Sequence, residues 1–250
     1  MPDAAAHPSP RILLWLVAVG FFMQTLDGTI VNTALPAMAT SLGESPLRLQ
    51  AVVVAYMLTM AALIPASGWL ADRFGSQRVF LSAIVLFSAG SAACALSNDL
   101  SQLIAARVLQ GLGAAVLLPV GRLVILQHFP REELLSAMSF VAIPGLIGPL
   151  IGPTLGGWLV ETASWHWIFL INLPVGLVGA LATMRYMPNL KRTDAGRFDL
   201  AGYAMLVLAM IAISLALDGL GGLGWASTLV VLLMVVQLKK SLLLTLFSLT

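Results

Sequence analysis

Residues 11–36 decide the fold class of this chain, because they read RILLWLVAVGFFMQTLDGTIVNTALP and form an apolar run whose only charge after Arg11 is Asp27. A helix that crosses a bilayer needs about 20 mostly apolar residues, and this run is longer than that. The whole chain is 59% hydrophobic and 10% charged, whereas a soluble domain carries about 25% charged residues. We therefore predict an all-α integral membrane protein.

The composition excludes several other classes. The apolar runs are about twice as long as the strands of a membrane barrel and lack their period-two alternation. With one cysteine, Cys94, and a net charge of +2, the chain fits neither a disulfide scaffold nor a nucleic-acid binder. A cleavable signal peptide does not explain the first run, because the run continues past Asp27 and further spans follow.

Eight segments are long and apolar enough to be predicted as spans. They are 12–39, 49–70, 79–97, 101–126, 137–160, 167–187, 199–217 and 224–238. We expect a cytoplasmic tail over 1–10, a six-helix bundle over 11–187, a cytoplasmic linker over 188–198, two additional transmembrane helices over 199–238 and an atypical tail over 239–250. That tail is too short to span, and its Leu/Ser/Thr-rich composition predicts a premature end or a change of reading frame.

The distribution of basic residues predicts the orientation, because cytoplasmic loops carry an excess of Lys and Arg. With the N-terminus in the cytoplasm, ten basic residues fall on inner segments and only Arg48 falls on an outer one. Arg107 and Arg122 lie inside the fourth span. We expect Arg122 to reach the cytoplasmic headgroups, and the interfacial aromatic belt to include Trp165 and Trp167.

Asp27 and Arg107 are ionisable residues at bilayer depth, where a charge costs several kcal/mol unless it faces a cavity or a counter-charge. Asp27 lies about 14 Å from the outer end of its helix and Arg107 about 10 Å from the outer end of its own, from the rise per residue. Two readings remain open: a permanent ion pair, or a relay in which at least one of them handles protons.

The positions of these two charges in the chain favour the relay. Many transporters build a six-helix half from two three-helix repeats of inverted topology, so that the first helix corresponds to the fourth. The acid and the base fall on that matched pair. On the same two helices, we expect the polar residues Gln24, Asn32 and Gln110 to line a substrate cavity.

The fifth span is rich in glycine and proline. Small residues four apart let helices approach closely, and prolines bend a helix. We therefore predict a tightly packed helix with a bend. The residues that carry this pattern are Gly148, Gly152, Pro153, Gly156 and Gly157.

Several motifs resemble those of one transporter family. Residues 68–78, GWLADRFGSQR, resemble the signature loop of the major facilitator superfamily, and residues 103–115, LIAARVLQGLGAA, resemble its fourth-helix motif. The fifth-span pattern looks like its antiporter motif. Residues 26–36 and 165–174, the latter WHWIFLINLP, are similar to signatures of the 14-helix drug:proton antiporter branch of that superfamily.

The resemblance implies a fold and a set of roles. It implies a six-helix bundle of 3+3 inverted repeats plus two further transmembrane helices, in a multi-pass protein of the bacterial inner membrane with a cytoplasmic N-terminus. Asp27 and Arg107 match the proton-coupling acid and base. The gating loop matches at Gly68, Asp72, Arg73, Gly75 and Arg78. His166 stands where the branch commonly has Arg, and we expect it to be solvated at the outer surface.

The resemblance also suggests what the protein does. It implies proton-coupled export of small amphipathic or cationic compounds, with a small molecule, protons and the bilayer as partners and no nucleic acid. A 14-helix member needs about twice this length, so we expect an N-terminal half. The alternative is a non-transporting truncated fragment, or a half that needs a second half or a homodimer partner. We predict no enzyme, cofactor, metal or catalytic residue, because His7, His128 and His166 lie in loops or the tail.

Overall fold

The computed structural model describes residues 10–191, 196 and 198–217, with the backbone alone given for Pro10 and for 211–217. Chain contacts divide it into one unit over Met1–Gly196 and another over Arg197–Thr250. The described part is helical throughout. The first unit holds α1 (Pro10–Leu42), α2 (Pro46–Phe74), α3 (Ser76–Ala95), α4 (Leu100–His128), α5 (Leu134–Thr162), α6 (Trp167–Leu170) and α7 (Asn172–Tyr186).

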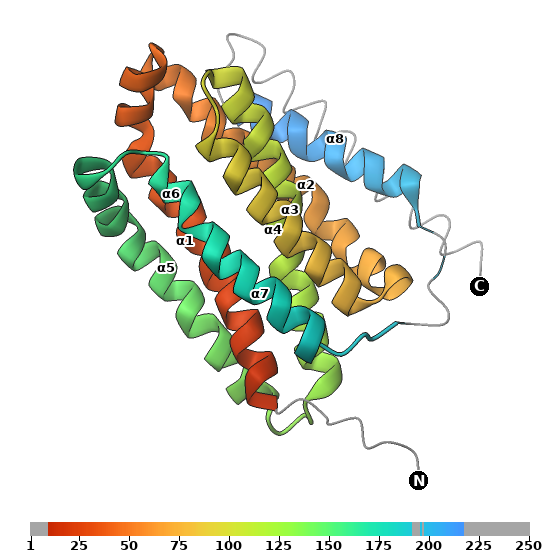
Figure 1. Ribbon diagram of the computed structural model, residues 1–250. Helices are drawn as coiled ribbons and strands as arrows, with labels where there is room; N and C mark the ends of the chain where they lie inside the picture. The colour runs from red at the N-terminus through yellow and green to blue at the C-terminus, as the bar shows by residue number, and fades with distance from the viewer. Residues whose placement is uncertain (1–9, 192–195, 197, 218–250) are drawn as a thin grey trace. The chain divides into compact units, whose positions relative to one another are not determined.

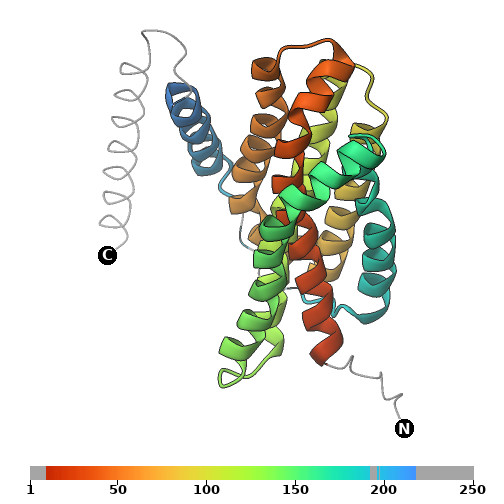
Figure 2. The same cartoon turned by 90° about the vertical axis from the view of Figure 1, so that its left-hand side faces the viewer.

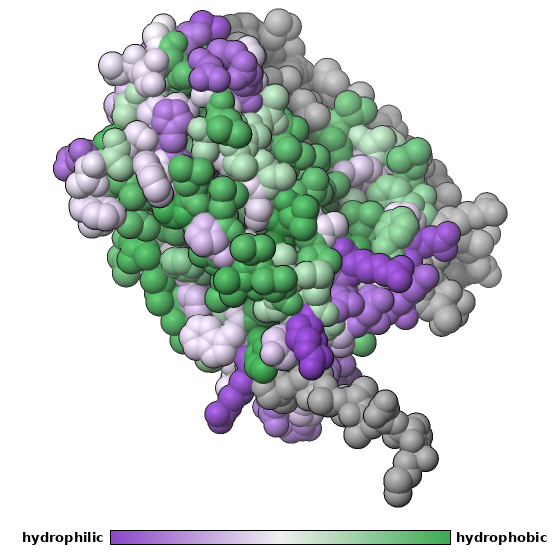
Figure 3. All heavy atoms as spheres, viewed as in Figure 1, coloured by the Kyte–Doolittle hydropathy of each residue, from purple (hydrophilic) through white to green (hydrophobic). Residues whose placement is uncertain are grey.

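Six spans in the described residues are long and apolar enough to cross a membrane, and α6 with α7 makes up the sixth. This confirms the predicted six-helix bundle and the all-α class. The sixth span runs on through Ile171, between α6 and α7, because Ile171 keeps helical φ and ψ of −61° and −23° and its N–H donates to the Trp167 carbonyl at 3.1 Å. Figure 3 shows apolar side chains over the middle of one face of the bundle and hydrophilic ones toward its ends.

The second unit contains α8 (Leu200–Leu217), a helix where the seventh span was predicted. The predicted span over 224–238 and the tail over 239–250 lie outside the described residues, as does the N-terminal tail over 1–9.

Local signals start the helices where the sequence provides caps. Ser45 caps α2 by accepting a hydrogen bond from the Arg48 backbone N–H at 3.4 Å, with Pro46 at the first position of the helix. Asp99 caps α4 by accepting from the Gln102 N–H at 2.9 Å. Such caps satisfy backbone donors that no helical partner reaches, so α2 and α4 can begin directly after Ser45 and Asp99.

Helix α1 lies alongside α5 and next to α7 in the bundle (Figures 1 and 2). Most of its buried apolar side chains are divided among three clusters, of which two are large and the third contains Val17 and Ala18. One large cluster contains Leu13, Phe80 and Val116, and the other contains Ile30, Met38 and Leu103. Asp27 lies between these clusters along α1, so the polar site is sealed on both sides by apolar packing.

Residues of the predicted linker contact the bundle at the α2–α3 turn. The Ser76 N–H donates to the Leu190 carbonyl at 2.9 Å, and the Leu190 N–H donates to Ser76 Oγ at 3.0 Å. The Ser76 hydroxyl also donates to the Pro188 carbonyl at 2.9 Å. The first residues after α7 are therefore tied to the start of α3.

Candidate functional site

The centre of the bundle holds a completely buried ion pair. Arg107 Nη1 on α4 donates to Asp27 Oδ2 on α1 at 2.6 Å, and both side chains are 0% exposed. Both charges therefore face the bundle interior, as the cost of exposing them to lipid required. The ion pair, one of the two predicted alternatives, is thus present in this structure. An ion pair of this kind is compatible with a role in proton transfer.

Two amides complete the surroundings of Asp27. Gln110 Nε2 on α4 donates to Asp27 Oδ1 at 2.8 Å, and Asn172 Nδ2 on α7 donates to the same oxygen at 3.2 Å. Both amides also donate to Ser91 Oγ on α3, each at 2.9 Å. Asp27 thus accepts hydrogen bonds from three N–H groups.

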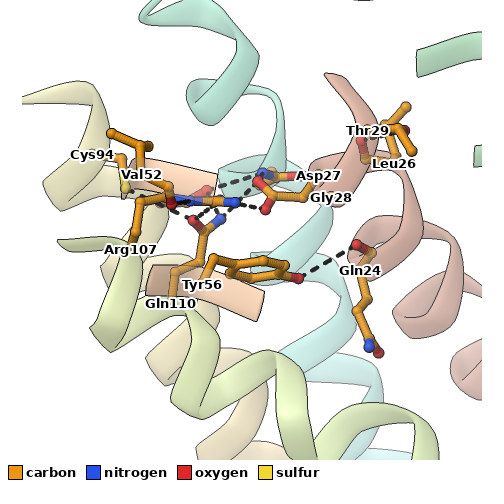
Figure 4. Close-up of polar contacts among 12 residues, drawn as sticks. Gln24, Leu26, Asp27, Gly28, Thr29, Val52, Tyr56, Cys94, Arg107 and Gln110 are labelled. Carbon is orange, nitrogen blue, oxygen red and sulfur yellow. Dashed lines mark hydrogen bonds and ion pairs between the residues drawn. The ribbon is translucent and has the colours of Figure 1, made fainter. Parts of the chain in front are cut away.

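The guanidinium of Arg107 is held on its other sides by neutral groups. Its Cζ lies 4.0 Å from the ring centroid of Tyr56 on α2, and its Nε donates to the Val52 carbonyl at 3.4 Å. Gln110 Oε1 accepts from Arg107 Nη1 at 2.6 Å. Figure 4 shows Asp27 from α1 and Tyr56 from α2 converging with Arg107 and Gln110, which both come from α4. Arg107 Nη2 has no hydrogen-bond partner among the described residues.

Close packing of α3 on α4 brings Ser91 within reach of Gln110. A Cβ at Gly90 would lie 2.5 Å from the Gln110 backbone N, closer than real side chains approach, so only glycine permits this contact. Without a side chain at position 90, the neighbouring hydroxyl of Ser91 comes close enough to accept from the Gln110 amide.

The three expected cavity residues separate in the structure. Asn32 is exposed, with Nδ2 donating to the Gly28 carbonyl at 3.5 Å. Gln24 is 8% exposed, and its Nε2 contacts Met60 Sδ at 3.2 Å. Gln110 is 0% exposed, so its placement in an open cavity wall is wrong: the ion pair engages both ends of its amide.

An open groove lies between α4 and α5, and a residue of α1 also lines it. Its volume is about 460 Å³, and its lining residues are Phe21, Leu118, Arg122, Leu126, Met138, Ser139, Val141 and Ala142. This volume is in the range of small-molecule sites. The exposed side chain of Arg122 agrees with the expected path toward the headgroups. Sequence patterns did not indicate this groove.

The fifth-span pattern packs against α1 in a regular register. A Cβ at Gly148 would lie 2.5 Å from Thr25 Oγ1, and Gly152 and Gly156 face Thr29 and Thr33 in the same way. The predicted close approach is confirmed. Pro153 is exposed and Gly157 has no neighbouring atom within 4 Å, so these two lie off the contact with α1.

Of the residues predicted for the loop, only Gly75 lies between α2 and α3. The end of α2 contains Gly68, Asp72 and Arg73, and the start of α3 contains Arg78. Gly75 is buried with φ of 96°, Asp72 is half-buried, and Arg73, Arg78 and Gly68 are exposed. Among the described residues no ion pair involves Asp72, Arg73 or Arg78. Their charges are therefore available at the surface of the bundle.

Two predictions for the loop between α5 and α6 are wrong. Trp165 is 4% exposed and packs against Phe169, so it belongs to the core and not to an interfacial belt, whereas Trp167 is 50% exposed. His166 is half-buried and stacks on Trp165 at 3.7 Å between ring centroids. This burial lowers the pKa of His166 below its usual value, so its imidazole is neutral near pH 7 and does not replace the charge of an arginine.

Several residues of the site are not singled out by sequence patterns. Ser91 and Tyr56 are ordinary residues of apolar helices, and Asn172 stands out only within the 165–174 motif. A polar side chain in the middle of a span is itself a weak signal of an interior position. In the described part no cluster of three or more His, Cys, Asp or Glu residues could hold a metal ion.

A membrane bundle of six spans around a buried acid–base pair defines a helical transport protein, and comparison with known proteins agrees. Residues 17–249 match the family model of the Major Facilitator Superfamily, and the chain belongs to that superfamily. It is 61% identical over 215 residues to the "Putative multidrug resistance protein MdtD" of Serratia proteamaculans, and 62% identical over 214 residues to that of Yersinia enterocolitica.

These alignments cover 86% of this chain and 45% of each relative, so the chain spans about half the length of the curated relatives it matches. Solved structures share the fold. The human organic anion transporter MFSD10 (TETRAN) has a TM-score of 0.62 at 14% identity over 82% of this chain and 55% of its own. The peptide transporter POT in complex with sulfate has a TM-score of 0.61 at 19% identity over 87% of this chain and 47% of its own.

Proposed function

We propose that this chain works in proton-coupled export of small amphipathic or cationic compounds, as the N-terminal bundle of a multidrug exporter. The observation that carries the proposal is the ion pair of Asp27 and Arg107, which is completely buried at 2.6 Å. Such a pair contributes little net stability relative to apolar packing, because both charges lose their hydration. A buried acid in a membrane helix is therefore explained best by a function.

In this mechanism Asp27 carries the proton. A proton bound to Asp27 removes the negative charge that Arg107 faces, while Arg107 keeps Gln110 Oε1, the Val52 carbonyl and the Tyr56 ring as partners. The ionised and protonated states therefore favour different packings of α1 against α4. A proton gradient can shift the balance between two conformations only through such a differential stability.

The substrate is proposed to bind on the open side of the bundle. The groove between α4 and α5 is open on this side. Asn32 and the buried Gln24 stay predicted cavity residues outside the groove lining, whereas Gln110 belongs to the proton site. Arg122 is the charged residue among the lining residues of the groove. The positive charge of Arg122 would repel a cation, so the groove suits amphipathic compounds without a positive charge. A cationic compound would bind outside the groove.

A second bundle is proposed to complete the cavity. In the most apolar 18-residue stretch of each helix, only 22% of the residues are buried in α2 and in α5, against 56% in α1 and 61% in α4. Apolar faces of this kind fit a second half, or a second copy of this chain. Asp72, Arg73 and Arg78 with Gly68 and Gly75 would form the gating contact to that partner, and the bend at Gly148 to Gly157 would accompany the movement of α5.

The orientation proposed is a cytoplasmic N-terminus in the bacterial inner membrane. It rests on the ten-to-one distribution of basic residues between the two sides of the predicted spans.

The test is Asp27→Asn in energised vesicles that contain the chain together with a C-terminal bundle from an MdtD relative. We expect loss of proton-driven movement of a fluorescent amphipath, with insertion unchanged, because the amide keeps size and polarity but cannot exchange a proton. The chain without the second bundle should insert and not export. Undiminished export by the variant would refute Asp27 as the coupling site, and export by the chain alone would favour a homodimer.

A further inference from the structure

Asn172 is a buried amide that the proton step above does not yet use. It is 2% exposed and is the first residue of α7, directly after Ile171. Its Nδ2 donates to both Asp27 Oδ1 and Ser91 Oγ. A residue at this position connects the sixth span to the acid on α1.

Gln110 makes the same two donations, but its amide cannot turn over. Its Oε1 accepts from Arg107 Nη1 at 2.6 Å and from Cys94 Sγ at 3.7 Å, so turning would present an N–H to the guanidinium. No described residue donates a hydrogen bond to Oδ1 of Asn172. Of the two amides, only Asn172 can exchange its nitrogen and oxygen without losing a bond at its carbonyl.

Protonation of Asp27 creates a need for an acceptor. An ionised carboxylate only accepts hydrogen bonds, whereas a carboxylic acid has one O–H to donate. The three groups that bond Asp27 in this structure are all donors. A buried O–H without an acceptor would weaken proton binding considerably, so one neighbour has to reverse its hydrogen bond.

We propose that Asn172 is the positioning residue that responds to the protonation of Asp27. When Asp27 is ionised, Asn172 Nδ2 donates to it. When a proton binds Asp27, the Asn172 amide turns about its Cβ–Cγ bond and Oδ1 accepts the new O–H. One proton is gained, no covalent bond of Asn172 changes, and Arg107 keeps its bond to Gln110 Oε1.

Ser91 makes this reversal feasible, because a hydroxyl can both donate and accept. Before the turn Ser91 Oγ accepts from both amides. After it, Oγ still accepts from Gln110 while its O–H can donate to Asn172 Oδ1. The pair therefore stays hydrogen-bonded in both protonation states.

The location of Asn172 gives the reversal a structural consequence. The residue stands at the junction of α6 and α7, so a change in its hydrogen bond to the acid acts directly on the sixth span. The other titratable or charged groups around Asp27 are Arg107 from α4, Tyr56 from α2 and Cys94 from α3. On α5 and α7 the described titratable groups, Glu161, Arg185 and Tyr186, lie at the helix ends, and α6 has none.

The inference rests on the proposed function only in naming the proton as the signal, and its test needs no export. The chain is reconstituted in lipid nanodiscs and titrated with pH while its carboxyl bands are followed by infrared spectroscopy. The band of protonated Asp27 is the one that Asp27→Asn removes. In Asn172→Ala we expect this band at higher frequency, because the O–H has lost its acceptor.

Asn172→Asp is the second variant, and its similar size protects the fold. It places a second carboxyl at hydrogen-bond distance from Asp27 Oδ1, and two such groups share one proton. We expect proton uptake at about tenfold lower proton concentration than in the wild type. The matched control is Asn98→Asp, the same change at an exposed asparagine between α3 and α4, which should leave the titration unchanged.

The outcomes separate this inference from the proposed function. An unshifted Asp27 band in Asn172→Ala, or a titration of Asn172→Asp equal to that of Asn98→Asp, overturns the role of Asn172 whatever the export assay shows. If Asn172→Ala does not insert, Asn172→Asp alone decides. Shifted bands together with undiminished export by Asp27→Asn would support the reversal at Asn172 and refute the coupling role of Asp27.

Discussion

The bundle contains two groups of acidic and basic residues in opposite environments. Asp27 and Arg107 are fully buried and paired at 2.6 Å, whereas Asp72, Arg73 and Arg78 lie at the α2–α3 turn without an ion pair in the described part of the chain. Burial explains the difference, because a charge removed from water must find a partner and a charge at the surface need not. Acidic and basic side chains therefore have to pair with each other in the bundle centre, whereas those at the α2–α3 turn can contact other groups.

The largest loss of stability is expected from Arg107→Ala. It leaves Asp27 buried without its counter-charge, which costs about 3–5 kcal/mol of unfolding free energy. Reversible unfolding in mixed micelles measures this loss. The double variant Asp27→Asn with Arg107→Gln should be clearly more stable than Arg107→Ala, and equal stability would show that the pairing of charges is not what matters.

A smaller effect is expected at the α1–α5 contact, which sharpens the distinction between charge burial and packing. In Gly148→Ala the new Cβ would lie 2.8 Å from the Leu26 backbone N, so the helices must separate at a cost of about 1–3 kcal/mol. The control is Gly157→Ala, where no atom lies within 4 Å and a helical alanine should stabilise by about 0.5–1 kcal/mol. We expect the unfolding free energy to fall in Gly148→Ala and to rise in Gly157→Ala. Changes in the same direction would contradict the packing explanation.

Gly75→Ala tests the turn that carries the surface charges. Gly75 has φ of 96°, a region that side chains rarely adopt, so alanine should cost about 1–2 kcal/mol. Gly68→Ala on α2 is the control, since no atom lies within 4 Å of its Cβ position. Thermal denaturation of both variants provides the measurement, and equal midpoints would argue against backbone strain at position 75.

The smallest change in stability is expected from Asp72→Asn, the surface counterpart of Asp27→Asn. Asp72 is half-buried and has no ion pair among the described residues, so removing its charge should alter the unfolding free energy by about 0.5 kcal/mol or less. If Asp72 forms the gating contact to a second bundle, export with that bundle should fall while the melting temperature stays the same. A large loss of stability would instead place Asp72 among the structural charges of the bundle.

Much of the fold follows from the sequence, but the site follows only in part. The spans over 12–39 and 101–126 are predicted from apolar length, and α1 and α4 contain them. The similar depth of Asp27 and Arg107 is likewise predicted from the helical rise. The prediction failed for Gln110, because its burial depends on the rotation of α4 and on Gly90, which lets α3 approach.

Sequence alone determined the class, the six spans of the bundle and the presence of an acid and a base at one depth. These are local properties, since each helix in a membrane satisfies its own backbone hydrogen bonds and needs only sufficient apolar length. The tertiary structure decided which side chains meet. Asp27 is bonded by Gln110, 83 positions away, and by Asn172, 145 positions away. Such contacts depend on how the helices rotate and pack against one another, which no single segment specifies.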